Sequence, residues 1–194
     1  MISAVILAAG LSRRMGRPKQ LLKLGDKTML EHVVDRVSRA KVSEIIVVLG
    51  AHRREIDQVL CPYNVRCVYN PRYASGLGTS VATGAVAVDP EARGILFVAG
   101  DQPLITSEFI SDLIDVFEKT GALIVRTEMG IPAIFNIRLK GQLIELTGDT
   151  GGRQLLEKFR EEVVTVPGCP GFMYKDVDTE EDYQKVMDLW EKLQ

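Results

Sequence analysis

The sequence is of moderate length and has nearly balanced charge. It contains 194 residues, of which 46% are hydrophobic and 26% are charged, and its formal net charge is −2. This length suits one domain, spanning residues 1–194, with enough chain for a central sheet covered on both faces. A chain so close to neutrality has no general electrostatic attraction to nucleic acid or to an anionic membrane, and we expect neither as a partner.

Two further features concern the cellular compartment. The three cysteines, Cys61, Cys67 and Cys169, include no Cys-x-x-Cys pair, so they indicate neither a disulfide framework nor a zinc site. The apolar stretch after Met1 has no basic region before it and is too short to cross a membrane. We therefore expect a cytoplasmic protein.

Short apolar runs with strand character alternate with helical patterns along the whole chain. In chain order, strands are predicted at residues 2–7, 44–49, 65–69, 94–99, 122–126, 133–136 and 162–166. Helices are predicted between them at residues 28–40, 53–60, 79–88 and 106–119, and from residue 179 onward. This alternation predicts a three-layer α/β/α fold with a mostly parallel, Rossmann-like central sheet and right-handed crossovers. Ligands bind beyond the carboxyl ends of the strands in such sheets.

The loop after the first predicted strand combines small and basic residues, reading AAGLSRRMGRPK over residues 8–19. Small residues let backbone N–H groups approach a ligand closely, and successive N–H groups form an anion-binding concavity. Arg13 and Lys19 add the positive charge that a triphosphate requires when pyrophosphate departs. The loop has neither the Walker A spacing nor the Rossmann glycine pattern, so a flexible basic surface loop is the alternative interpretation.

Carboxylates occur at two places that suit a metal ion. Asp101 follows the predicted strand at residues 94–99, where a carboxylate can hold Mg²⁺ against phosphate, although an aspartate before proline also starts many turns. Asp176 and Asp178 alternate along an extended segment and therefore share one face. Thr179 and Asp182 also fit a capping box at the start of the final helix.

Residues 7–19, read as Leu-Ala-Ala-Gly-x-Ser-x-Arg-Met-Gly-x-x-Lys, resemble the signature of the molybdenum cofactor nucleotidyltransferases. The likeness is greatest to the cytidylyltransferase branch, and it extends to the molybdopterin-guanine-dinucleotide synthases and to sugar-phosphate and methylerythritol cytidylyltransferases. It implies a fold of the nucleotide-diphospho-sugar transferase type. Because the loop wraps the nucleotide in that family, the resemblance implies nucleotide contacts at Leu7, Ala8, Ala9, Gly10, Ser12, Arg13 and Lys19.

Later motifs carry further roles by the same resemblance. Gly-Asp-x-Pro implies that Asp101 holds the metal and contacts the nucleotide, and Asp-x-Asp-Thr-x-x-Asp implies Asp178 as a second metal ligand. Gly78 and Ser80 match a loop that contacts the pyrimidine, although Thr79 or Ser80 can equally cap the predicted helix. Residues 130–135 and 148–153 resemble acceptor-side segments, which implies acceptor contacts at Pro132, Asp149 and Arg153. Arg153 enters a predicted helix, whose positive end favours a phosphate.

These residues predict a Mg²⁺-dependent transfer of CMP from CTP to molybdenum-molybdopterin, with release of pyrophosphate. Lys19, Arg13 and Asp101 are the predicted catalytic residues, because positioning and charge neutralisation require no nucleophilic side chain. Ala9 favours CTP, since guanylyl-transferring relatives carry glycine there, whereas Ile131 replaces a histidine common in molybdopterin-using members. Alternatives are another phosphorylated acceptor, GTP as the donor, or a nucleotide-binding maturation factor with little turnover. A transient contact with a molybdoenzyme or its chaperone is a further expectation.

Overall fold

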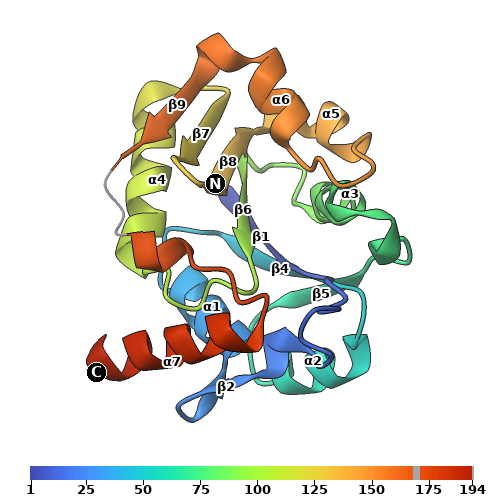
Figure 1. The fold of residues 1–194 in the computed structure, drawn as a ribbon. Coiled ribbons are helices and arrows are strands. Elements are labelled where there is room, and N and C mark those ends of the chain that lie inside the picture. Colours follow the sequence, from blue (N-terminus) through green and yellow to red (C-terminus); the bar gives the residue numbers. More distant parts are fainter. Residues whose placement is uncertain (168–170, 194) are drawn as a thin grey trace.

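The computed structural model describes residues 1–167 and 171–193, and a seven-stranded sheet lies at its centre (Figure 1). The strands are β1 (Ile2–Ala8), β4 (Glu44–Leu49), β5 (Arg66–Tyr69), β6 (Gly94–Ala99), β7 (Ile124–Thr127), β8 (Gly130–Asn136) and β9 (Val163–Val166). They lie in the order β5-β4-β1-β6-β8-β7-β9. Within this sheet β8 is antiparallel to both of its neighbours, and every other adjacent pair is parallel. The predicted mostly parallel sheet is therefore confirmed.

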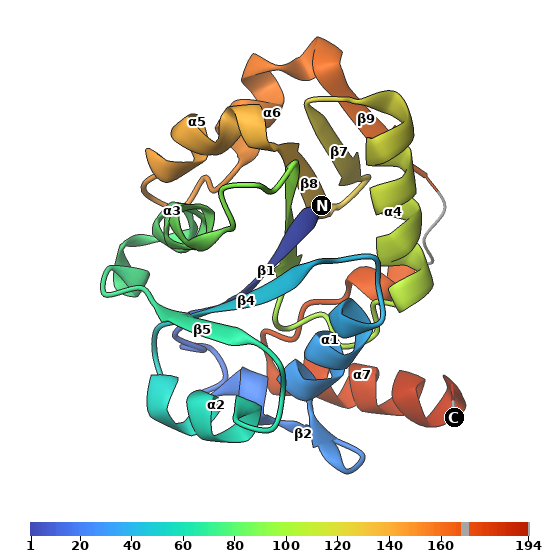
Figure 2. The ribbon, with the colours of Figure 1, turned by 180° about the vertical axis from the view of Figure 1, so that it is seen from behind.

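Helices cover both faces of the sheet, as Figures 1 and 2 show from opposite sides. One face is covered by α1 (Met29–Ser38), α2 (Arg53–Leu60) and α4 (Ser107–Thr120), and the other by α3 (Leu77–Ala87), α5 (Lys140–Ile144) and α6 (Arg153–Lys158). Successive side chains of a strand point to opposite faces, so β1 supplies Ile6 to the first layer and Val5 to the second. This burial on both faces explains why β1 is apolar except at Ser3, whose hydroxyl donates to Glu44.

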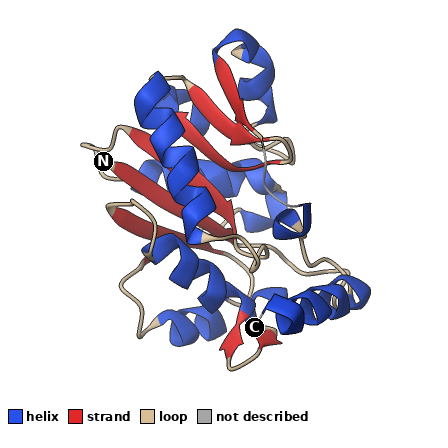
Figure 3. Ribbon diagram, turned by 90° about the vertical axis from the view of Figure 1, so that its left-hand side faces the viewer, coloured by secondary structure: helices blue, strands red, loops and turns tan. Residues whose placement is uncertain are grey.

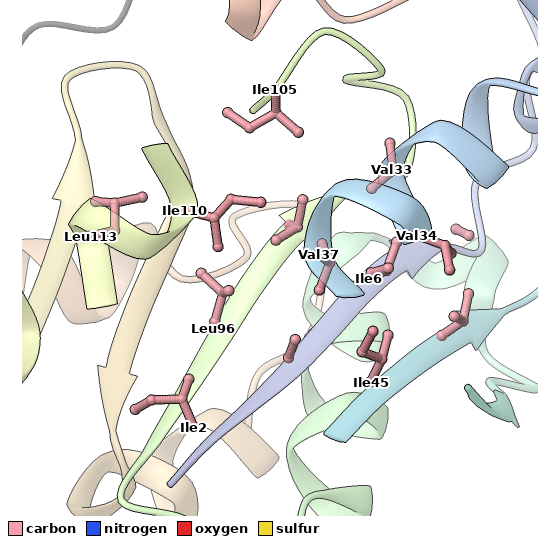
Figure 4. Close-up of a cluster of buried hydrophobic side chains, with 14 of the residues drawn as sticks. Ile2, Ile6, Val33, Val34, Val37, Ile45, Leu96, Ile105, Ile110 and Leu113 are labelled. Atoms are coloured by element: carbon pink, nitrogen blue, oxygen red, sulfur yellow. The ribbon is translucent and has the colours of Figure 1, made fainter. Parts of the chain in front are cut away.

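The packing on the first face follows from the helical spacing of its apolar residues. Figure 4 shows Val33, Val34 and Val37 of α1 lying over Ile6 of β1 in one buried cluster. Thr28 begins α1 through a capping box in which it accepts from the Glu31 N–H and its own N–H donates to the Glu31 carboxylate. The helix start is therefore set locally, and burial of its apolar stripe fixes it to the sheet.

A small additional layer lies beyond the carboxyl ends of the central strands and is visible at the bottom of Figure 3. It consists of a two-stranded ribbon, β2 (Lys23–Leu24) and β3 (Lys27–Thr28), and the terminal helix α7 (Glu180–Leu193). Leu24 of the ribbon and Val186 of α7 share one apolar cluster, which holds the helix against the ribbon. Thr179 and Asp182 form the predicted capping box at the start of α7.

Short 3-10 helices complete the described chain at Lys19–Leu21, Tyr73–Ser75, Ile137–Leu139, Arg160–Glu162 and Gly171–Tyr174. Among the described residues, none of the helices combines the length and the apolar character that a bilayer-crossing segment needs. Cys61 and Cys67 are free thiols, and Cys169 lies outside the described residues.

Candidate active site

The predicted phosphate loop and the predicted metal carboxylate leave the sheet side by side. β1 and β6 are neighbours in register, with Leu7 opposite Ala99, so the loop after β1 lies beside the loop that carries Asp101. Between these loops, the start of α3 and the β7–β8 turn lies a cavity of about 910 Å³. It opens at the carboxyl ends of the parallel strands, which is where the fold class predicts a ligand.

Most of the predicted site residues line this cavity. They are Leu7, Ala9, Gly10, Arg13, Lys19, Ser80, Asp101, Asp149 and Arg153. Four other predicted contacts, Ala8, Ser12, Gly78 and Pro132, are not part of the cavity lining, and neither is Asp178. The alternation of side chains along β1 explains Ala8, which packs in the cluster on the opposite face of the sheet. Ser12 instead accepts a hydrogen bond from the Lys19 backbone N–H at 3.2 Å, so it shapes the loop from within.

Lys19 is the electrostatic centre of the site. Its ammonium donates to Asp101 and, at 2.8 Å, to Asp178 Oδ1, and its side chain is only 12% exposed. Burial alone would lower the pKa of Lys19, but the charges of Asp101 and Asp178 outweigh it and raise the pKa above its ordinary value. Lys19 is therefore a firmly charged cation at the end of the cavity.

The two aspartates of the C-terminal segment differ in environment. Burial opposes ionisation of Asp178, yet Lys19 and Arg14 lower its pKa below the ordinary value, with Arg14 at 2.5 Å. The pKa of Asp176 is raised, first by burial and then by the charge of Asp101. Asp176 lines the cavity and accepts a hydrogen bond from Gln102 Nε2 at 2.8 Å. Asp176, which sequence reasoning ranked below Asp178, is thus the one that faces the ligand space.

These carboxylates fit a hard divalent cation. Asp101 and Asp176 supply oxygen donors on the cavity wall, and burial, followed by the charge of Asp101, raises the pKa of Asp176, an effect that a bound cation would oppose. Mg²⁺ is commonly held by one or two protein carboxylates together with substrate phosphate oxygens. Among residues 1–167 and 171–193, no three His, Cys, Asp or Glu side chains form a larger ligand set.

Ser80, which is predicted to contact the nucleobase, forms another part of the cavity wall. Ser80 is 5% exposed and lines the cavity together with Ala9 and Tyr73. The buried Asn70 donates through Nδ2 to the hydroxyl oxygens of Thr79, at 2.9 Å, and of Ser80, at 3.0 Å. Asn70 therefore fixes the orientation of Ser80, a positioning role that only the folded chain reveals.

The prediction that Thr79 or Ser80 caps this helix is wrong. The helix α3 begins two residues earlier than predicted, at Leu77, and its N-cap is Gly76 without a side-chain hydrogen bond. Thr79 and Ser80 therefore lie inside the first turn. The Thr79 hydroxyl donates to backbone carbonyls instead, with Gly76 and Arg72 as its acceptors at 2.9 Å.

The loop of the predicted acceptor side is joined directly to the base-side loop. The Gly78 N–H donates to the Gly148 carbonyl at 2.8 Å, which places Asp149 and the neighbouring Thr150 on the cavity wall. Gly76 has a φ of 107° and a ψ of 166°, and a Cβ there would lie 2.3 Å from the carbonyl carbon of Gly148. Only glycine accommodates both this backbone conformation and this close approach.

Two buried side-chain atoms have no hydrogen-bond partner among the described residues, and both belong to the cavity lining. They are Gln102 Oε1 and Arg126 Nε. Buried polar groups are nearly always hydrogen-bonded, and leaving one unpaired costs about 1–3 kcal/mol. Both residues line the cavity, although the two unpaired atoms themselves are buried. Sequence reasoning missed these two residues because Gln102 is the variable position of Gly-Asp-x-Pro and Arg126 is one residue of a predicted strand.

A basic loop with backbone amides, lying beside carboxylates at one cavity at the ends of two adjacent parallel strands, is the arrangement of the nucleotidyltransferase class. The chain belongs to the family described as the MobA-like NTP transferase domain, which matches residues 4–163. The family predicted from the sequence is therefore confirmed.

Individual relatives agree with this assignment. A curated protein named Bifunctional protein GlmU, from Francisella tularensis subsp. holarctica (strain OSU18), is 30% identical over 166 residues, covering 82% of this chain. The chain spans only 36% of the length of that relative. A solved homologue of Mycobacterium tuberculosis rv0371c from Mycobacterium sp. strain JC1 is 32% identical, with a TM-score of 0.85 and coverage of 100% of this chain and 98% of the other.

One of the similar structures contains a metal ion. The Rv0371C protein of M. tuberculosis H37Rv in complex with manganese is 30% identical and has a TM-score of 0.78, covering 96% of this chain and 98% of the other.

Proposed function

We propose that this protein transfers a nucleoside monophosphate, preferentially CMP from CTP, to a phosphorylated acceptor and releases pyrophosphate. The observation that carries the proposal is the convergence of Arg13, Lys19 and Asp101 on one cavity, from two loops that adjacent strands place side by side. Membership of the MobA-like family supports the nucleotidyl chemistry.

The side chains act by binding and positioning. The backbone of the loop after β1, with Arg13 and Lys19, holds the triphosphate and stabilises the negative charge that develops on the departing pyrophosphate. Because the acceptor phosphate is itself the nucleophile, no side chain has to form a covalent intermediate. Ser80 and Ala9 form part of the wall of the base pocket. Asp149 and Arg153 line the same cavity and would contact the acceptor.

The metal proposed here is Mg²⁺, held by Asp101 with Asp178 as predicted and with Asp176 as an additional ligand. Bound there, it would polarise the α-phosphate and neutralise charge. The manganese complex of the related mycobacterial protein supports the use of a divalent ion by this fold. In the ligand-free protein the Lys19 ammonium donates hydrogen bonds to Asp101 and Asp178. Because these carboxylates would bind the metal, the ammonium must turn toward the phosphates as the metal–nucleotide enters.

The preference for CTP rests on the methyl group of Ala9. Ala9 is 4% exposed and contributes to the cavity wall, so its methyl group restricts the room for a larger purine. A steric restriction of this kind discriminates by about 1–3 kcal/mol, which gives a preference rather than exclusion.

The proposal is tested by measuring pyrophosphate release with each of CTP, GTP, ATP and UTP, in Mg²⁺, with molybdopterin and a panel of sugar and alcohol phosphates as acceptors. We expect CTP to give the highest kcat/KM of the four nucleotides, and pyrophosphate release with molybdopterin would identify it as the acceptor. Tight binding of Mg-CTP without pyrophosphate release from any acceptor would instead identify a maturation factor.

The site assignment is tested with Asp101→Asn. Loss of the metal interaction, worth several kcal/mol, should lower kcat/KM at least about 10³-fold. Breaking a fully buried ion pair costs about 3–5 kcal/mol, and the loss of stability should stay below that because Asp178 still pairs with Lys19. Asp112→Asn, on the exposed side of α4, is the matched control and should be fully active. Activity of Asp101→Asn within tenfold of the wild type would refute the assignment.

A further inference from the structure

A second cavity adjoins the first at the edge of the sheet. It has a volume of about 380 Å³ and lies between α6, the turn after it, and strands β7 and β9. Its lining residues are Arg126, Arg153, Leu156, Glu157, Arg160, Val163 and Thr165. Arg126, Arg153 and Leu156 also line the larger cavity, so a ligand that fills the first can extend into the second.

Most of the charged side chains that line this second cavity are positive. Three guanidinium groups line it, from Arg126, Arg153 and Arg160, against the single carboxylate of Glu157. None of the three arginine side chains forms an ion pair or hydrogen bond within residues 1–167 and 171–193. In a protein whose net charge is −2, this excess is a local feature and not a consequence of composition.

Three other arginines of the described chain, Arg14, Arg17 and Arg66, pair with carboxylates. Arg14 pairs with Asp178 at 2.5 Å and Arg17 with Glu180 at 2.7 Å, although both are largely exposed. The second cavity, by contrast, has one lining carboxylate, Glu157, for its three arginines.

Arg126 provides a second and independent sign of a missing ligand. It lies on β7 opposite Thr165 of β9, and its Nε is buried without a hydrogen-bond partner in the described part of the chain. A guanidinium group presents its donors in a planar fork that matches the oxygens of a phosphate or carboxylate. A buried cationic donor is stabilised when an anion pairs with it, whereas like charges without a partner repel one another.

We propose that Arg126, Arg153 and Arg160 bind an anionic oxygen group, a phosphate or a carboxylate, that the acceptor carries in addition to the phosphate that attacks the nucleotide. This inference rests on the proposed function, because it assigns the larger cavity to nucleotide and acceptor. The triphosphate has its own cations, Arg13 and Lys19, at the other end of the site. The acceptor is therefore an elongated molecule with two separate anionic groups, and the second cavity selects for it against acceptors that carry a single phosphate, molybdopterin among them.

The first test measures anion binding without turnover. Inorganic phosphate and malonate are titrated separately into ¹⁵N-labelled, nucleotide-free protein while the arginine Nε–H signals are followed by NMR, with Arg126→Lys identifying the Arg126 signal. We expect a saturable shift of the Arg126 signal, and the anion that binds more tightly distinguishes phosphate from carboxylate. Arg160→Gln should weaken this binding at least tenfold. Arg138→Gln, an exposed position that lines neither cavity, should retain wild-type affinity.

Arg160 lines the second cavity and not the larger one. Because Arg160 is exposed, Arg160→Gln should be as stable as the wild type, and urea unfolding checks this. The absence of a saturable shift, or equal anion affinity in the wild type and in Arg160→Gln, would overturn the anion site.

The second test links the anion to the acceptor. In pyrophosphate-release kinetics, Arg160→Gln should raise the KM for the acceptor at least tenfold while the KM for CTP and the kcat at saturating acceptor stay unchanged. An unchanged acceptor KM would refute the assignment of the anion to the acceptor. Failure of the wild type to release pyrophosphate from any nucleotide would instead refute the proposed function, and the NMR result would show separately whether the anion site exists.

Discussion

Gly76→Ala is expected to separate the two loops that close the cavity. A Cβ at Gly76 would lie 2.3 Å from the carbonyl carbon and 2.4 Å from the carbonyl oxygen of Gly148, both backbone atoms that cannot turn aside as a flexible side chain can. The backbone conformation of Gly76, with φ 107° and ψ 166°, is itself almost confined to glycine and costs other residues about 1–3 kcal/mol. Overpacking adds about 1–3 kcal/mol, so the total is about 2–6 kcal/mol.

Gly148→Ala is the matched control, because it changes the other partner of the same contact. Gly148 also has a positive φ, of 67°, but a Cβ there would meet no atom within 4 Å. Its cost is therefore limited to the backbone strain of about 1–2 kcal/mol. The excess cost of Gly76→Ala over Gly148→Ala isolates the contact between the loops.

Urea unfolding followed by the fluorescence of Trp190, the single tryptophan, measures both free energies of unfolding. Because the displaced loops carry Ser80 and Asp149, we also expect Gly76→Ala to lower kcat/KM at least tenfold more than Gly148→Ala does. Equal stability and equal activity of the two variants would refute the reasoning that this loop contact shapes the cavity.

Three further predictions concern the base wall, a buried histidine and the thiols. Ala9→Gly should raise the ratio of kcat/KM for GTP to that for CTP by about 10- to 200-fold, and an unchanged ratio would show that the methyl group does not select the base. Burial lowers the pKa of His32, although the hydrogen bond of its ring to a backbone carbonyl acts in the opposite direction. The unfolded chain therefore binds more protons than the folded one. The free energy of unfolding should therefore fall as the pH drops below about 6.5, and urea titrations of His32→Gln should lack that component. Burial raises the pKa of the Cys67 thiol to about 12, so a disulfide reagent at pH 8 should label the exposed Cys61 much faster, and comparable rates would contradict this.

The sequence predicts the main elements well because their signals are local. The strands β1, β4 and β6 are apolar apart from Ser3 and Glu44, and α1 has a capping box followed by an apolar stripe. The β2–β3 ribbon escapes such reasoning because each of its strands has two residues, too few for any periodicity. The start of α3 was misplaced because glycine at the N-cap leaves no side-chain capping signal.

The candidate site is predictable to a lesser degree, since its residues come together through tertiary packing. Arg13, Lys19 and Asp101 follow from strand ends and family motifs, and they do line one cavity. The contact of Lys19 with Asp178 joins residues 159 positions apart and leaves no trace in local spacing. The role of Arg126 could not be predicted either. The sequence placed Arg126 in a predicted strand, and its role depends on which residues pack beside β7.

The attachment of α7 to the N-terminal loop has a consequence for biosynthesis. Arg14 and Arg17 of that loop pair with Asp178 and Glu180, and Tyr183 donates to the Lys23 carbonyl. The segment that is predicted to bind phosphate therefore leaves the ribosome well before its anchors, since Arg14 and Asp178 are 164 positions apart. A nascent chain can form its early strands while still elongating, but it acquires a rigid nucleotide site only when translation has passed α7.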